Sequence, residues 1–77
     1  MTDWKLHIES DPNILYGKPV IKHTRIPVDL ILEKLAEGES FEELLNSYPF
    51  IKKESIYACL SFAAETIKNE VIYSISS

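Results

Sequence analysis

The single cysteine, Cys59, is the feature that most constrains the fold, because the chain has only 77 residues. A lone cysteine can neither close an internal disulfide nor complete a structural zinc site, and these are the usual supports of very small domains. A domain of this size buries only about 60% of the surface that its unfolded chain exposes. Its stability must therefore come from apolar packing, and an oligomer or a partner is the expected additional support.

The composition is that of an ordinary globular protein, with 45% hydrophobic and 26% charged residues. No apolar run approaches the ~20 residues that a membrane span requires, and residues 1–9 alternate in polarity instead of forming a signal-peptide core. We therefore expect a cytoplasmic protein without membrane contact. The net charge of −4 disfavours nucleic-acid binding, which depends on the neutralisation of phosphates.

The charges are, however, segregated along the chain. Residues 12–28 contain no acid and carry three bases, Lys18, Lys22 and Arg25, whereas residues 29–43 contain six acids and a single lysine. A local basic surface can therefore exist on an acidic protein.

The N-terminal third predicts a short β element. Residues 4–9 alternate between apolar and polar side chains, which predicts a strand with one buried face. An Asp-Pro-Asn turn at residues 11–13 ends it. Residues 17–27 form a second extended segment with a proline near each end, and this pattern predicts a hairpin that turns at residues 23–24.

Three amphipathic segments predict helices. The first has Pro27 at its first helical position, carries its apolar stripe over residues 28–35 and stops at Gly38. The second covers residues 40–48, between a Ser-x-x-Glu capping box and a proline. The third follows residue 51 and reaches residue 69. Its apolar stripe consists of Ile56, Cys59, Leu60, Ala63 and Ile67.

These elements predict a mainly α fold, a three-helix bundle with a short N-terminal β element. The second and third helices have the lengths and linker of a helix-turn-helix unit, in which the later helix reads a DNA groove. Many three-helix domains bind only protein, so a purely structural helix-turn-helix in a protein-interaction module remains the alternative. We expect one domain over residues 1–69 and a C-terminal tail over residues 70–77.

An ordered series of motifs carries a family resemblance. It includes Asp-Pro at residues 11–12, Gly-Lys-Pro-Val-Ile at 17–21 and Thr-Arg-Ile-Pro-Val at 24–28, and it continues to about residue 66. In these motifs the chain resembles a short prokaryotic family, domain of unknown function four-three-three. The resemblance implies an antitoxin of a type II toxin-antitoxin pair, with a homeodomain-like helix-turn-helix, which neutralises a PIN-like ribonuclease toxin and binds operator DNA as a homodimer.

The chain departs from the family pattern at three positions. His23 stands where the family usually has glycine, so the turn must tolerate a side chain at a position of positive φ. Lys52 replaces a threonine that usually caps the third helix, and Ser55 replaces an acid in its first turn.

The candidate DNA-binding residues come from the hairpin and from the third helix. Lys52 and Lys53 would hold a phosphate at the helix start, and side chains on its outer face would reach base edges. The alternatives are solvated lysines and, for Arg25, an ion pair with Asp29 or Glu33. The full set is Lys22, His23, Arg25, Lys52, Lys53, Ser55 and Tyr57.

The tail carries much apolar surface and fits either a strand or a helix. The resemblance implies that it binds the toxin, because antitoxins commonly keep a terminal segment that becomes ordered against their toxin. The tail could equally pack on its own domain or across a homodimer. The candidate toxin-binding residues are Val71, Ile72, Tyr73 and Ile75.

Catalysis has little support in the sequence. The two glycines are too few for a phosphate-binding loop, and no serine or cysteine stands near a histidine and an acid in a suggestive arrangement. Neither His7 nor His23 has a partner at metal-ligand spacing. We therefore predict no enzyme activity, no metal and no cofactor, and a core role for Cys59.

Overall fold

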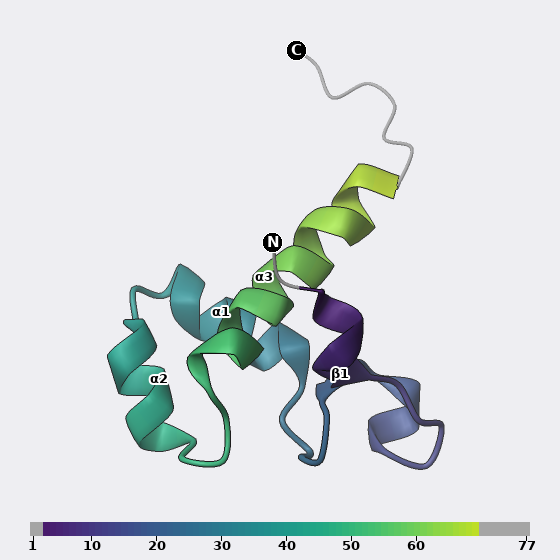
Figure 1. The fold of residues 1–77 in the computed structure, drawn as a ribbon, viewed down its shortest axis with the longest axis horizontal. Helices are drawn as coiled ribbons and strands as arrows, with labels where there is room; N and C mark the ends of the chain where they lie inside the picture. The colour runs from purple at the N-terminus through teal and green to yellow at the C-terminus, as the bar shows by residue number, and fades with distance from the viewer. Residues whose placement is uncertain (1–2, 70–77) are drawn as a thin grey trace.

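The computed structural model describes residues 3–69, so the predictions for the tail lie outside the described residues. Three helices and a short two-stranded antiparallel sheet make a mainly helical fold. The long helix α3 (Lys53–Asn69) contacts every neighbouring layer, and its last turns extend beyond the other elements (Figure 1). The other elements are η1 (Trp4–Leu6), β1 (Ile8–Glu9), η2 (Leu15–Gly17), β2 (Val20–Ile21), α1 (Val28–Ala36) and α2 (Phe41–Ser47).

The sheet joins the N-terminus to the hairpin. Strands β1 and β2 pair antiparallel, with Ile8 opposite Ile21 and Glu9 opposite Val20. Val20 also bridges to Pro27, so the chain folds back on itself between β2 and α1. The predicted hairpin is therefore confirmed.

The hairpin turns at His23, which has a φ of +65°. The Thr24 N–H donates to the Ile21 carbonyl at 3.1 Å, and the Thr24 hydroxyl donates to the same oxygen at 2.7 Å. That hydroxyl also accepts from the Ile26 N–H at 3.0 Å. The hydrogen bonds of Thr24 thus fix the turn directly after His23. His23 itself adopts the left-handed conformation that is expected of a glycine.

The predicted strand over residues 4–9 is wrong in its first half, because Trp4–Leu6 forms a 3₁₀ turn. The Asp3 carboxylate caps this turn by accepting from the Lys5 N–H at 3.1 Å. The turn lets Trp4 reach α3, where its ring meets Phe62 edge to face at 4.8 Å between centroids and its indole N–H donates to Glu65 at 2.9 Å. A long-range contact has overridden the local alternation.

Helix α1 has the predicted extent. Pro27 is its N-cap and not its first helical residue, a shift of one position. At the other end the Gly38 N–H donates to the Leu35 carbonyl and the Glu39 N–H to the Lys34 carbonyl, both at 3.0 Å. This is a Schellman motif, and it requires the φ of +99° that Gly38 adopts.

Helices α2 and α3 also begin and end where the sequence predicts. The capping box of α2 is complete: Ser40 Oγ accepts from the Glu43 N–H at 3.1 Å, and Glu43 Oε1 accepts from the Ser40 N–H at 2.8 Å. The helix ends just before Tyr48 and Pro49. The five residues 48–52 then lead into α3.

The core lies where α3 crosses the hairpin, α1 and α2. Its fully buried members include Val20, Ile31, Leu44, Ile56 and Cys59. The predicted stripe on α3 is buried only in its first half, because Leu60 is 40% and Ile67 60% exposed. Among the described residues, the other elements do not extend along the last turns of α3 (Figure 1).

Candidate nucleic-acid interface

Two hollows meet at one end of the molecule, on either side of the hairpin turn. Both are lined by His23, Thr24 and Phe50. The first, of about 580 Å³, adds Arg25 and the apolar side chains of Ile14 and Ile26, among others. The second, of about 340 Å³, adds His7, Lys22, Lys52 and Ser55, among others. We call the side chains of Lys22, His23, Arg25, Phe50 and Lys52 the hairpin-turn surface.

The connection between α2 and α3 brings its side of this surface into place. The Ile51 N–H donates to the Tyr48 carbonyl at 3.1 Å, and the Ile51 side chain is buried. Phe50 and Lys52, on either side of this buried residue, are both exposed. The same turn therefore anchors one residue in the core and presents its two neighbours to solvent.

Predicted cations from two distant segments meet here. Lys22 and Arg25 come from the hairpin and Lys52 from the start of α3, and Lys53 follows it in the first turn. None of the four takes part in either ion pair found among residues 3–69. Among residues 3–69, Glu9 is the one carboxylate that lines either of these two hollows. The surface is thus locally positive on a chain of net charge −4.

The alternative ion pair of Arg25 does not form. Asp29 instead binds Lys18, with 2.9 Å between Nζ and Oδ2, and this hydrogen bond lowers the pKa of the Asp29 carboxyl. Arg25 is exposed, and Glu33 belongs to neither ion pair in the described part of the chain. The guanidinium of Arg25 is therefore available to an external anion.

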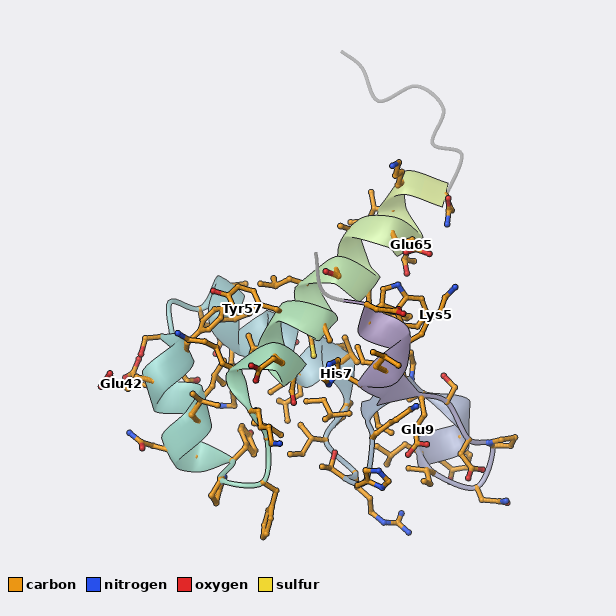
Figure 2. All side chains as sticks on the ribbon, in the orientation of Figure 1. Lys5, His7, Glu9, Glu42, Tyr57 and Glu65 are labelled. Atoms are coloured by element: carbon orange, nitrogen blue, oxygen red, sulfur yellow. The ribbon has the colours of Figure 1, made fainter. Side chains whose placement is uncertain are left out.

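Two predicted residues of α3 do not lie as expected. Ser55 was expected on the outer face, but it is only 6% exposed, and its Oγ accepts from the Lys52 N–H at 3.2 Å. A serine in the first turn of a helix can accept a hydrogen bond from a backbone N–H at the helix start. Here Ser55 accepts from Lys52, and its side chain is therefore buried. Tyr57 is partly exposed but lines neither hollow. Its ring lies 5.1 Å from that of Phe41, on the α2 side of α3 (Figure 2).

Phe50 is the member of the surface that sequence reasoning missed. It is 87% exposed although it is a large apolar residue. The available signal was its position, since it follows a proline between two capped helices and belongs to neither apolar stripe.

No reactive centre is seen among the described side chains. Within residues 3–69, no three His, Cys, Asp or Glu residues converge as a metal site would require. Cys59 is buried, as predicted, and burial raises the pKa of its thiol to about 12. Such a thiol stays protonated and unreactive at neutral pH. None of the described helices is both long and apolar enough to cross a membrane.

A short hairpin packed with three helices around one core defines the class, a small, mainly helical domain. The family model described as "Protein of unknown function (DUF433)" matches residues 8–63. The chain therefore belongs to the DUF433 family, and the predicted resemblance is confirmed.

Two further proteins are similar to part of this chain. A DUF433 member protein from Anabaena variabilis ATCC 29413 has a similar solved structure, with a TM-score of 0.74 and 28% identity over 79% of this chain and 60% of that one. An uncharacterized protein, y4eO, from Sinorhizobium fredii (strain NBRC 101917 / NGR234) is 39% identical over 49 residues. That match covers 64% of this chain but only 22% of the relative.

Proposed function

We propose that this protein is a cytoplasmic antitoxin, which binds its operator DNA through the hairpin-turn surface and neutralises a PIN-like ribonuclease toxin. The observation that carries the DNA half is the meeting of Lys22, Arg25 and Lys52, which come from two distant segments, at one end of the molecule. Cations gathered at one site bind phosphates far more strongly than the same charges dispersed over the surface.

The arrangement of α2 and α3 supports the same proposal. A seven-residue helix, a five-residue connection and a long helix follow the order of a homeodomain-like helix-turn-helix. In this proposal α3 is the recognition helix, and Lys52 and Lys53 bind phosphate beside its free backbone N–H groups. A homodimer would place two such helices on the two halves of a palindromic operator.

The toxin half rests on the family resemblance and on two other surfaces. The exposed acids of α1 and α2, such as Glu33 and Glu42, would attract a basic partner. The exposed Leu60 and Ile67 on α3 lead toward the tail, whose apolar residues would extend the contact.

The DNA half is tested with duplexes that cover the region upstream of the protein's own gene. Binding is measured as a function of salt for the wild type and for Lys22→Glu/Lys52→Glu. The plot of log K against log[salt] has a negative slope, and its magnitude should fall by about 0.9 for each phosphate that the variant no longer neutralises. Affinity at ~50 mM salt should fall by on the order of 100-fold. Lys5→Glu/Lys68→Glu makes the same change in net charge away from the surface and should bind within a few-fold of the wild type.

Equal losses of affinity in the two double variants would show that only net charge matters and would contradict this interface. Absence of binding by the wild type at ~50 mM salt would remove the DNA half and leave the protein-interaction module.

Neutralisation of the toxin is tested by expressing the neighbouring gene alone and together with this chain. Rescue by the full chain, but not by a chain ending at Asn69, would assign neutralisation to the tail, whereas absence of any rescue would contradict the toxin half.

A further inference from the structure

Phe50 projects into solvent from the turn between α2 and α3. The turn is closed by the hydrogen bond from the Ile51 N–H to the Tyr48 carbonyl, and Ile51 is only 5% exposed. Pro49, immediately before Phe50, fixes its own φ near −65°. The ring of Phe50 therefore projects at 87% exposure from a backbone anchored on both sides.

Cationic side chains lie on both sides of this ring. Phe50 lines the first hollow together with Arg25 and the second together with Lys22 and Lys52. An exposed aromatic ring between positive groups matches the chemistry of a nucleic acid, in which flat apolar bases lie between two rows of phosphates. An apolar pocket on a protein partner would need a ring of acids to match the same charges.

We propose that Phe50 enters the base stack of the operator and partly unstacks one base step, while Lys22, Arg25 and Lys52 hold phosphates on either side. The inference rests on the proposed DNA binding and adds a contact to bases and a distortion of the duplex. Apolar wedges of this kind kink DNA, so binding would favour easily unstacked pyrimidine–purine steps.

The experiment uses the full chain and upstream duplexes in which 2-aminopurine replaces adenine at one position at a time. This base fluoresces more strongly when it is unstacked. We expect a rise at one step with the wild type and with Phe50→Tyr, which keeps the ring, and no rise with Phe50→Ala. Phe50→Ala should weaken binding by about 10- to 100-fold and leave the salt slope unchanged, because it removes stacking and leaves every phosphate neutralised.

The outcomes separate this inference from the function on which it rests. If the wild type binds the duplexes with a steep salt slope but no position brightens and Phe50→Ala binds equally well, the wedge is wrong and the DNA half stands. If Phe50→Ala keeps DNA affinity but loses toxin rescue, the ring contacts protein and the wedge is again wrong. If the wild type does not bind, both fail. Since Phe50 packs little, an unchanged urea midpoint will show that Phe50→Ala is folded.

Discussion

His23 stands in a backbone conformation that side chains usually avoid. Its φ of +65° lies in the left-handed region, where a residue other than glycine costs roughly 1–2 kcal/mol, with histidine among the more tolerant types. The chain accepts this cost at the centre of the hairpin-turn surface. A side chain kept there against strain is what a binding contact would require.

His23→Gly should therefore stabilise the protein by about 0.5–1 kcal/mol and weaken DNA binding, since it relieves the turn but removes a side chain from the surface. The first effect is measured from the urea midpoint and the second by titration of the upstream duplex. His23→Val is the matched control, and it should lower stability, because a β-branched residue tolerates positive φ least. A destabilised His23→Gly would contradict this account of the turn.

At the scale of elements, the start of α3 is held by a hydrogen bond to the hydroxyl of Ser55. Ser55 accepts from the Lys52 N–H at 3.2 Å, the same connection that Glu43 makes to Ser40 in α2. The shorter side chain reaches the N–H while staying buried. The Ser55 N–H in turn donates to the Lys52 carbonyl at 2.9 Å, so both backbone groups of Lys52 are bonded to Ser55.

Ser55→Ala should lower the free energy of unfolding by about 1 kcal/mol, since it removes one helix-capping hydrogen bond. The measurement is urea unfolding, followed by helix content. Ser47→Ala, at the exposed end of α2, is the control and should change stability by less than about 0.5 kcal/mol. Similar destabilisation of both variants would indicate that the Ser55 hydrogen bond contributes little.

The elements that could be predicted from sequence are those defined by local chemistry. Three such features are the capping box, the Schellman glycine and the Thr24 turn. Each forms hydrogen bonds to backbone groups within a few residues, so a short sequence motif is enough to predict it. The strand over residues 4–9 failed because the conformation there is set by the contacts of Trp4 with α3. The exposure of Ile67 was likewise missed, because periodicity locates a face but not the partner that covers it.

At the scale of the whole molecule, the candidate site could be predicted only in part. Its cations were identified one segment at a time, but their meeting depends on how the hairpin packs beside the start of α3, which no local pattern encodes. The burial of Ser55 could not be predicted either, because it too depends on how the start of α3 packs. Phe50 was missed because an apolar residue in a connection has no period from which burial or exposure could be inferred.

Trp4 connects the two ends of the described chain, and its removal should affect the whole fold. Trp4→Ala should lower the free energy of unfolding by about 2 kcal/mol, less than a fully buried tryptophan because Trp4 is only half-buried. Trp4→Phe keeps an aromatic edge but loses the hydrogen bond to Glu65, and should cost about 1 kcal/mol. Lys68→Ala, at an exposed position of α3, is the control. If thermal unfolding shows the same loss of stability for Lys68→Ala as for Trp4→Ala, the contact of Trp4 with α3 does not have this role.

The hydrogen bond from Trp4 to Glu65 spans 61 positions of the sequence, and this sets an order of events during protein synthesis. The ribosome makes Trp4 61 residues before Glu65, which is among the last of the described residues. At 5–20 residues per second, Trp4 waits about 3–12 s before Glu65 exists. During that interval the nascent chain carries an aromatic side chain without its partner, and the segments of α1 and α2 are made before α3, the helix against which they pack.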